Sequence, residues 1–255
     1  MLIDTHTHIY LKDFDKDRQQ VIDECLNLKV SKLLLPNIDS NTINDVINLC
    51  KAYEGICFPM VGLHPCSVNE NYQEELDKLI PYINNLNPIA IGEIGIDLYW
   101  NKTTLTEQIE AFKEQIIWAK KHELPIVIHA RDSYQEIFNV LDEMNDDKLK
   151  GVFHCFSSNI DDANHIIAYG GFKLGIGGVV TFKNAGLDKT LTHISLDNLV
   201  LETDSPYLTP APYRGKRNKS SYIPLIAEKL SEIYTVDFTE IAKITTNNAK
   251  EVFNL

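Results

Sequence analysis

The chain has 255 residues, of which 44% are hydrophobic and 24% are charged, so it is long enough to bury one large core or two small ones. Its 24 basic and 36 acidic residues give a formal net charge of −12, which argues against a protein that binds polyanions over its whole surface. A local basic loop or bound cations can still favour a nucleic-acid substrate at one place.

Short runs rich in Val, Ile and Leu alternate with longer amphipathic runs along the whole sequence. The strand-like runs cover residues 2–4, 30–35, 57–63, 88–94, 125–129, 151–154, 171–176 and 198–202. The longer runs have helical periodicity, as at 104–122, where Ile109, Phe112 and Ile116 fall on one face. Each helix would return the chain for another buried parallel strand.

Eight units in 255 residues give about 32 residues per unit, close to the ~30 that a βαβ unit needs. The pattern predicts an α/β fold, namely a (β/α)8 TIM barrel with 238–253 as an extra C-terminal helix. A doubly wound open sheet predicts similar alternation, and the pattern alone does not separate the two. Because no Pro-, Gly- or Ser-rich linker divides the chain, we expect residues 1–255 to form a single domain.

The N-terminus and the cysteines indicate where the protein works. The N-terminus lacks the basic and apolar regions of a signal peptide, and no stretch approaches 18 apolar residues. The five cysteines include no C-x-x-C pair, as expected in a reducing compartment. We expect a cytoplasmic protein with no membrane segment and no obligate protein partner.

Metal-binding residue types follow the predicted strands, always at the same end. His6 and His8 come after the first strand, where alternate residues of an extended chain project to one side. Later strands end at or next to His64, Glu93, His129, His154 and Asp204. In a barrel these strand ends converge on one mouth, so we expect the side chains to lie close together.

This set is larger than one metal ion requires, since catalytic zinc takes three protein ligands and keeps a position open. Two divalent ions that share a carboxylate fit the count better. The ligand types suit zinc, manganese, cobalt or iron and do not select among them, and magnesium is a further candidate. The remaining histidines lie in helix-like or loop contexts and are interpreted as structural: His122, His165 and His193.

The ordered motifs resemble those of the TatD-type metal-dependent hydrolases, amidohydrolase-like barrels known as deoxyribonucleases. The resemblance covers nearly the whole chain and is carried by DTHTH (4–8), GLHP (62–65), GEIGID (92–97), HARD (129–132), HCFS (154–157), VTFKN (180–184), ETDSP (202–206) and PYRGKRN (212–218). One departure follows Asn218, where the family usually has a proline two residues on and this chain has Ser220.

The resemblance implies which residues hold each metal. One ion would be bound by His6, His8, Glu93 and Asp204, and the second by Glu93, His129 and His154, with Glu93 as the bridge. Asp204 is the best candidate for the general base, a role that its family counterpart also suggests. His64 is not needed for either metal, so it is a candidate donor to a phosphate oxygen or leaving group, or else part of a structural turn. Glu202 would orient a ligand from behind.

Basic and aromatic residues suggest how a substrate would bind. Arg131 is a candidate phosphate ligand, although a salt bridge to Asp132 is equally compatible with the sequence. Arg214 and Arg217 belong to a basic run after the eighth strand, where phosphate sites are common in barrels; the alternative is a solvated loop. Three aromatic residues are candidate stacking platforms for unpaired bases; alternatively, they pack against the barrel rim. These residues are Tyr99, Trp100 and Tyr213.

Together these features predict a metal-dependent phosphodiesterase acting on DNA, with single-stranded ends and 3′ to 5′ direction implied by the resemblance alone. An alternative is a metal-dependent hydrolase of amide, ester or small phosphoester bonds, because a fold does not fix a substrate. A metal-loaded interaction module is a third interpretation, and it leaves the open coordination positions unused.

Overall fold

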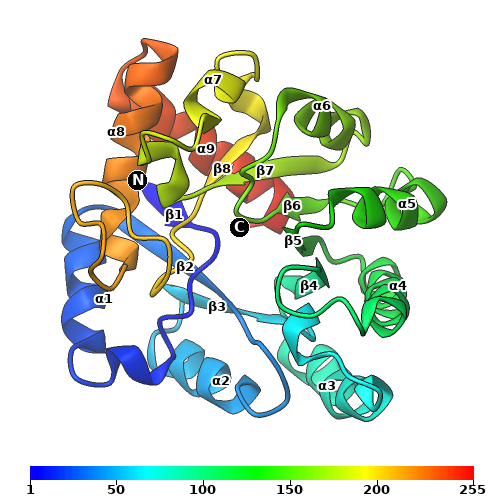
Figure 1. Ribbon diagram of the computed structural model, residues 1–255. Coiled ribbons are helices and arrows are strands. Elements are labelled where there is room, and N and C mark those ends of the chain that lie inside the picture. Colours follow the sequence, from blue (N-terminus) through cyan, green and yellow to red (C-terminus); the bar gives the residue numbers. More distant parts are fainter.

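The computed structural model describes all 255 residues, Met1–Leu255, and confirms the predicted TIM barrel (Figure 1). Eight parallel strands lie side by side in chain order: β1 (Leu2–Asp4), β2 (Val30–Pro36), β3 (Cys57–Val61), β4 (Ala90–Asp97), β5 (Ile126–Arg131), β6 (Gly151–Phe153), β7 (Phe172–Ile176) and β8 (Leu199–Leu201). Each predicted strand overlaps one of these. Three strands, β2, β4 and β5, extend beyond their predicted ends, so Glu93 and His129 lie inside β4 and β5 rather than closing them.

Helices surround the strands: α1 (Arg18–Asn27), α2 (Ile43–Ala52), α3 (Tyr72–Leu86), α4 (Leu105–His122), α5 (Tyr134–Met144), α6 (Ile160–Ala168), α7 (Leu187–Leu191), α8 (Ile223–Tyr234) and α9 (Phe238–Phe253). A cluster of 55 buried residues fills the space between strands and helices. None of the helices combines the length and apolar character needed to cross a membrane.

The floor of the barrel is closed by α9, the predicted extra helix, which passes behind the strands in Figure 1. Ala249, Val252 and Phe253 of α9 join a second cluster of ten buried residues, to which seven strands contribute one side chain each. Burial of side chains such as Val252 and Phe253 contributes about 1.5–3 kcal/mol each. Because this end is packed shut, only the opposite end is left open for a ligand.

The sheet closes between β1 and β8 just beyond the ends of both strands. The backbone N–H of Thr5 donates to the Leu201 carbonyl at 3.0 Å, and Thr7 and Ser205 form an isolated parallel bridge. The buried carboxylate of Asp4 accepts hydrogen bonds from the backbone and hydroxyl of Thr203 at 2.9 and 2.6 Å. The seam is therefore held by polar contacts at the mouth.

Candidate metal centre

Strand alternation places three of the predicted site residues inside the barrel. The floor cluster contains one valine from each of β5, β6 and β8. The residues two positions after these valines are His129, His154 and Glu202, respectively. Residues two apart on a strand face the same side, so these side chains point toward the axis just above the floor. Local periodicity thus accounts for their position.

His6, His8 and Asp204 meet at the seam between β1 and β8. The backbone N–H of Asp204 donates to the His6 carbonyl at 2.9 Å, and that of His8 donates to the Ser205 carbonyl at 2.8 Å. Asp204 has a φ of +55°, a left-handed conformation that is uncommon outside glycine and turns the chain sharply at this point. Two segments that are about 200 positions apart in sequence are thereby joined.

Glu93 occupies the centre of the site because β4 contains a bulge. Gly92 pairs with Val127 and Ile94 pairs with Ile128, so Glu93 is an extra residue with no partner on β5. A bulge re-aims the side chain of the unpaired residue. The Glu93 carboxylate is buried and points into the barrel between the seam and β5.

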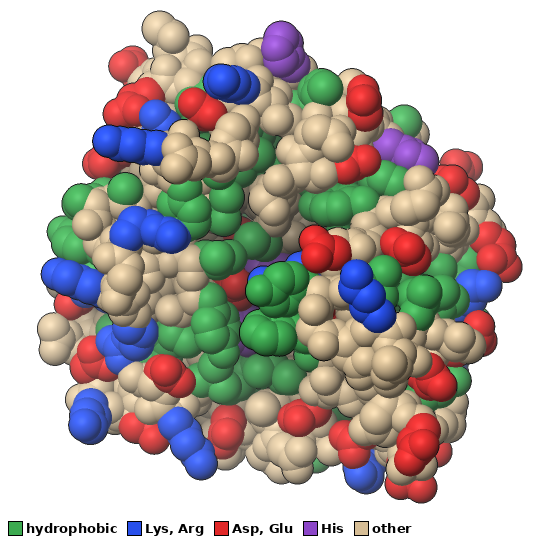
Figure 2. Space-filling model, viewed as in Figure 1, with side chains coloured by type: hydrophobic (Ala, Val, Ile, Leu, Met, Phe, Trp, Pro, Cys, Tyr) green, Lys and Arg blue, Asp and Glu red, His purple; other side chains and the backbone are tan.

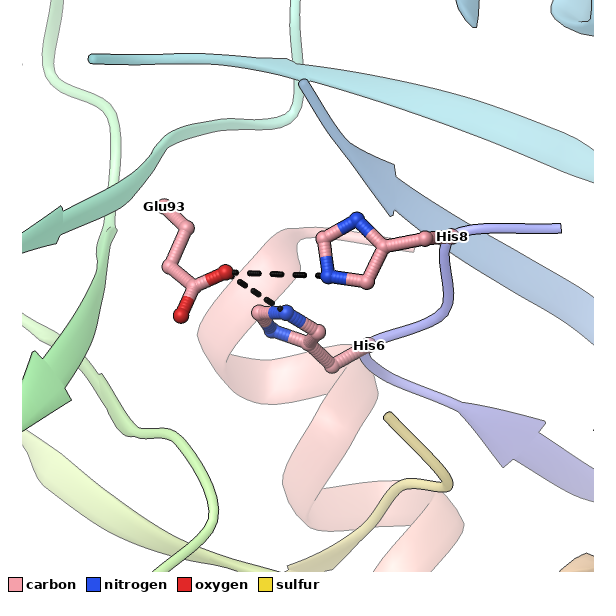
Figure 3. Close-up of side chains that lie close together, drawn as sticks. All are labelled: His6, His8 and Glu93. Atoms are coloured by element: carbon pink, nitrogen blue, oxygen red, sulfur yellow. Dashed lines mark hydrogen bonds and ion pairs between the residues drawn. The ribbon is translucent and has the colours of Figure 1, made fainter. Parts of the chain in front are cut away.

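The two oxygens of Glu93 face different histidines. Oε2 lies 3.1 Å from His6 Nε2 and 3.7 Å from His8 Nε2 (Figure 3). Oε1 lies 2.8 Å from His129 Nδ1 and 3.7 Å from His154 Nε2. A carboxylate with two sets of ligand atoms on its two oxygens has the arrangement needed to bridge two ions.

Asp204 completes the set on the Oε2 side. Its Oδ1 lies 3.5 Å from His8 Nε2 and 3.9 Å from the Nε2 atoms of both His6 and His154. The structure therefore brings together all six residues that the sequence predicted as metal ligands. Figure 2 shows a hollow at the centre of this face, with histidine and acidic side chains at its base.

Hydrogen bonds behind His8 decide which of its two ring nitrogens carries the proton. Nδ1 of His8 lies 3.0 Å from the Tyr10 hydroxyl, which donates its own proton to the Pro36 carbonyl at 2.8 Å. The hydroxyl can then only accept from His8, so Nδ1 carries the proton. Nε2 is left unprotonated and able to bind a cation.

Carboxylates lie behind two further histidines. Nε2 of His129 donates to Asp97 Oδ2 at 2.9 Å, since an ionised carboxylate only accepts. Nδ1 of His154 lies 2.8 Å from Glu202 Oε1 without the geometry of a hydrogen bond. The other nitrogen of each ring faces Glu93. Gly175 makes room for Glu202, because a Cβ there would lie 2.2 Å from Glu202 Oε2.

His64 has the opposite arrangement. Its Nδ1 accepts a hydrogen bond from the backbone N–H of Cys66 at 3.0 Å, so the neutral ring carries its proton on Nε2. Nε2 lies 3.4 Å from Glu93 Oε1. Although His64 is close enough to belong to the ligand set, its protonated nitrogen faces the cluster, which favours the role of a donor.

The donor set fits divalent cations. Imidazole and carboxylate side chains converge on one place, and the buried Nδ1 of His6 has no hydrogen-bond partner within the chain. Burial raises the pKa of Glu93, but His64, His6 and His154 outweigh it and hold that pKa well below its usual range. The carboxylate at the centre is therefore ionised.

The predicted phosphate ligands lie in two different environments. Arg131 has no carboxylate partner, so the expected alternative of a salt bridge to Asp132 is not formed. Arg217 forms a bidentate pair with Asp17 at 2.6 and 3.0 Å, and Arg214 stacks on Phe182. The basic loop, Arg214–Lys219, is thus drawn toward α1 instead of extending over the mouth.

The structure also separates the aromatic residues predicted as stacking platforms. Tyr213 is stacked on Tyr222, with ring centres 4.7 Å apart and planes 8° from parallel. Tyr99 and Trp100 are exposed after β4, next to the ligand histidine of β5. Sequence reasoning overlooked Asp97 and Tyr10, although Asp97 closes the GEIGID motif and was a detectable signal.

Comparison with known proteins places the chain in a family. A family model described as TatD related DNase matches residues 3–254. An uncharacterised metal-dependent hydrolase, YabD of Bacillus subtilis (strain 168), is 37% identical over the full length of both chains. A protein of Pectobacterium atrosepticum named 3′-5′ ssDNA/RNA exonuclease TatD is 30% identical, also over the full length of both.

Among solved structures, the TatD homologue YjjV from Escherichia coli K12 superposes with a TM-score of 0.93 at 26% identity. The match covers 100% of this chain and 98% of the other, so the whole barrel is shared. With the family model, the relatives and the site in agreement, the chain belongs to the TatD-related family of metal-dependent hydrolases.

Proposed function

We propose that the protein hydrolyses phosphodiester bonds of DNA, acting from single-stranded 3′ ends, with two divalent ions held on the two oxygens of Glu93. The observation that carries this proposal is the Glu93 carboxylate between two histidine sets, with the unpaired cation of Arg131 on the neighbouring strand. The relative named as a single-stranded DNA and RNA exonuclease supports the substrate class. The five unpaired cysteines support a cytoplasmic location.

Besides Glu93, three residues would hold one ion, namely His6, His8 and Asp204, and two would hold the other, namely His129 and His154. When bound, a pair of such ions supplies Lewis acidity and makes hydroxide available near neutral pH. Zinc, magnesium and manganese remain candidates, because the ligand types do not select among them.

Asp204 is suited to accept the proton of the attacking water. Burial raises the pKa of Asp204, but the proximity of His8, His154 and His6 outweighs this and gives a net decrease, so the carboxylate is ionised. Its side chain is also partly open to the mouth, unlike that of Glu93. A base must reach the proton it removes, and Asp204 is the cluster's accessible carboxylate.

His64 holds a proton at Nε2 on the same side of the cluster as His129, at a ring distance of 4.6 Å. Such a donor can stabilise charge on a phosphate oxygen or on the leaving oxygen. Glu202 acts from behind by orienting His154 and does not face the hollow.

The test is to incubate metal-reconstituted protein with end-labelled single- and double-stranded DNA, next to amide, ester and phosphomonoester substrates. We expect stepwise shortening of single strands from the 3′ end, lost in Asp204→Asn and in His6→Ala. Cleavage that survives in both variants would indicate a contaminating nuclease. Amide or ester turnover far above DNA turnover would instead establish the alternative hydrolase activity.

A further inference from the structure

Two large aromatic side chains lie exposed beside the metal centre. Tyr99 is 54% exposed and Trp100 is 69% exposed, whereas the chain's other tryptophan, Trp118, is 8% exposed. Exposed aromatic surface that is grouped and adjoins a polar cluster is typical of a ligand-binding site. The pair directly follows β4, so it lies on the rim of the mouth.

The aromatic pair is held in a fixed place relative to the cluster. The backbone N–H groups of Tyr99 and Trp100 both donate to Asp97 Oδ1, at 2.9 and 3.0 Å. The other oxygen of Asp97 lies 2.9 Å from Nε2 of His129. One buried carboxylate therefore positions both a candidate metal ligand and the aromatic residues.

Arg131 lies against the same pair. Its guanidinium carbon is 3.8 Å from the centre of the Tyr99 ring and 5.5 Å from that of Trp100. Of the chain's four arginines, Arg18 and Arg217 form ion pairs with carboxylates, whereas Arg131 and Arg214 form none and stack on aromatic rings. A guanidinium stacked by its face keeps the N–H groups at its edge free for an anion.

We propose that Trp100, Tyr99 and Arg131 form a nucleotide subsite next to the metal centre, in which an unpaired base stacks on Trp100 and Arg131 binds a phosphate of the same strand. This inference rests on the proposed function and specifies how single strands are recognised. Every base offers a π face, so the subsite tolerates any sequence, while a base inside a duplex has no free face.

Binding is tested by the fluorescence of the full-length, metal-loaded protein. Adding thymidine monophosphate or a single-stranded dT oligonucleotide should quench the emission of Trp100, since Trp118 is buried. An abasic oligonucleotide of the same length has the same phosphates and should give no quench. The Trp100→Ala protein should give no quench with either probe. This readout needs no cleavage, so it decides the subsite even if the protein proves inactive on DNA.

Kinetics provide the second readout. We expect Trp100→Ala to raise KM for the dT oligonucleotide roughly tenfold, with kcat and the KM for the abasic oligonucleotide unchanged and with partial rescue by Trp100→Phe. The matched control is Phe238→Ala, which removes an exposed aromatic at the start of α9. Equal KM values for wild type and Trp100→Ala, or a quench of equal size with the abasic oligonucleotide, would overturn the proposal.

Discussion

On the β1/β8 side of the mouth Arg217 and Lys219 are paired with acids in or next to α1, whereas on the β4/β5 side Arg131 has no acidic partner. Arg217 binds Asp17, and Lys219 lies 2.5 Å from Glu24. Figure 1 shows the segment before α8 beside α1, consistent with these pairs. The sequence therefore showed where basic residues are concentrated, but it did not show which of them lack an acidic partner and can bind a phosphate.

The candidate metal ligands come from both sides of the mouth, but the groups that orient them differ. On the β1/β8 side a neutral phenol, Tyr10, accepts from His8, while on the β4/β5 side the carboxylate of Asp97 accepts from His129. The Asp97 bonds to His129, Trp100 and Tyr99 outweigh the effect of burial and lower its pKa to about 2. Charge-assisted hydrogen bonds are roughly twice as strong as neutral ones. The two sides should thus respond unequally to substitution.

The largest effect is expected from substitution of Glu93, the residue that both sides of the mouth share. Glu93→Gln keeps the shape of the side chain and removes its charge, so turnover should fall by roughly 10³-fold or more together with bound metal. Metal content by mass spectrometry and DNA cleavage measure the two losses. The control is Glu228→Gln, an exposed position on α8, which should change neither. A Glu93→Gln protein with full metal content and activity would contradict a bridging role.

The next two substitutions each remove the group that orients a histidine on one side of the mouth. Asp97→Asn should weaken metal binding by about 10–100-fold, and Tyr10→Phe should weaken it by about tenfold or less, because only the first removes a charged acceptor. Competition with a fluorescent chelator measures both affinities. If Tyr10→Phe were the more damaging substitution, the assignment of the stronger orienting group to the β4/β5 side would be wrong.

Smaller effects are expected from substitution of Arg131 and Arg217, and they should differ between the two. Arg131→Ala should raise KM for single-stranded DNA about tenfold and reduce the slope of log affinity against log salt by about one. Arg217→Ala should leave that slope unchanged, because its charge is already neutralised by Asp17. Salt titrations of KM for both variants make the comparison. A larger change for Arg217→Ala would restore the sequence-based prediction that the basic loop binds phosphate.

The smallest effect concerns stability in acid. The hydrogen bond from Arg217 lowers the pKa of Asp17 below its value in the unfolded chain, about 3.9. The pair therefore stabilises the fold above pH 4, by about 1 kcal/mol or less for such a partly exposed pair, and this is lost as the pH falls through the lowered pKa. Melting curves between pH 6 and 3 should show a smaller acid-induced loss for Asp17→Asn than for wild type.

The sequence by itself determined the alternation of strands and helices, although this pattern did not separate a barrel from an open sheet. Alternating apolar runs predicted eight strands and the extra helix, because burial imposes periodicity locally. The positions of His129, His154 and Asp204 at strand ends, and the His-x-His spacing of His6 and His8, predicted that these side chains lie close together. The strand and helix predictions were confirmed because they depend on neighbours two to four residues away.

Only the tertiary structure decided which atoms of these residues act. The register shift that aims Glu93 inward requires β5, and the protonation of the His8 and His129 rings depends on Pro36 and Asp97, respectively. Arg217 is neutralised by an acid 200 positions away, which no local pattern records. Hydrogen bonds and ion pairs act between atoms in space, so protonation and charge balance emerge only when the barrel closes.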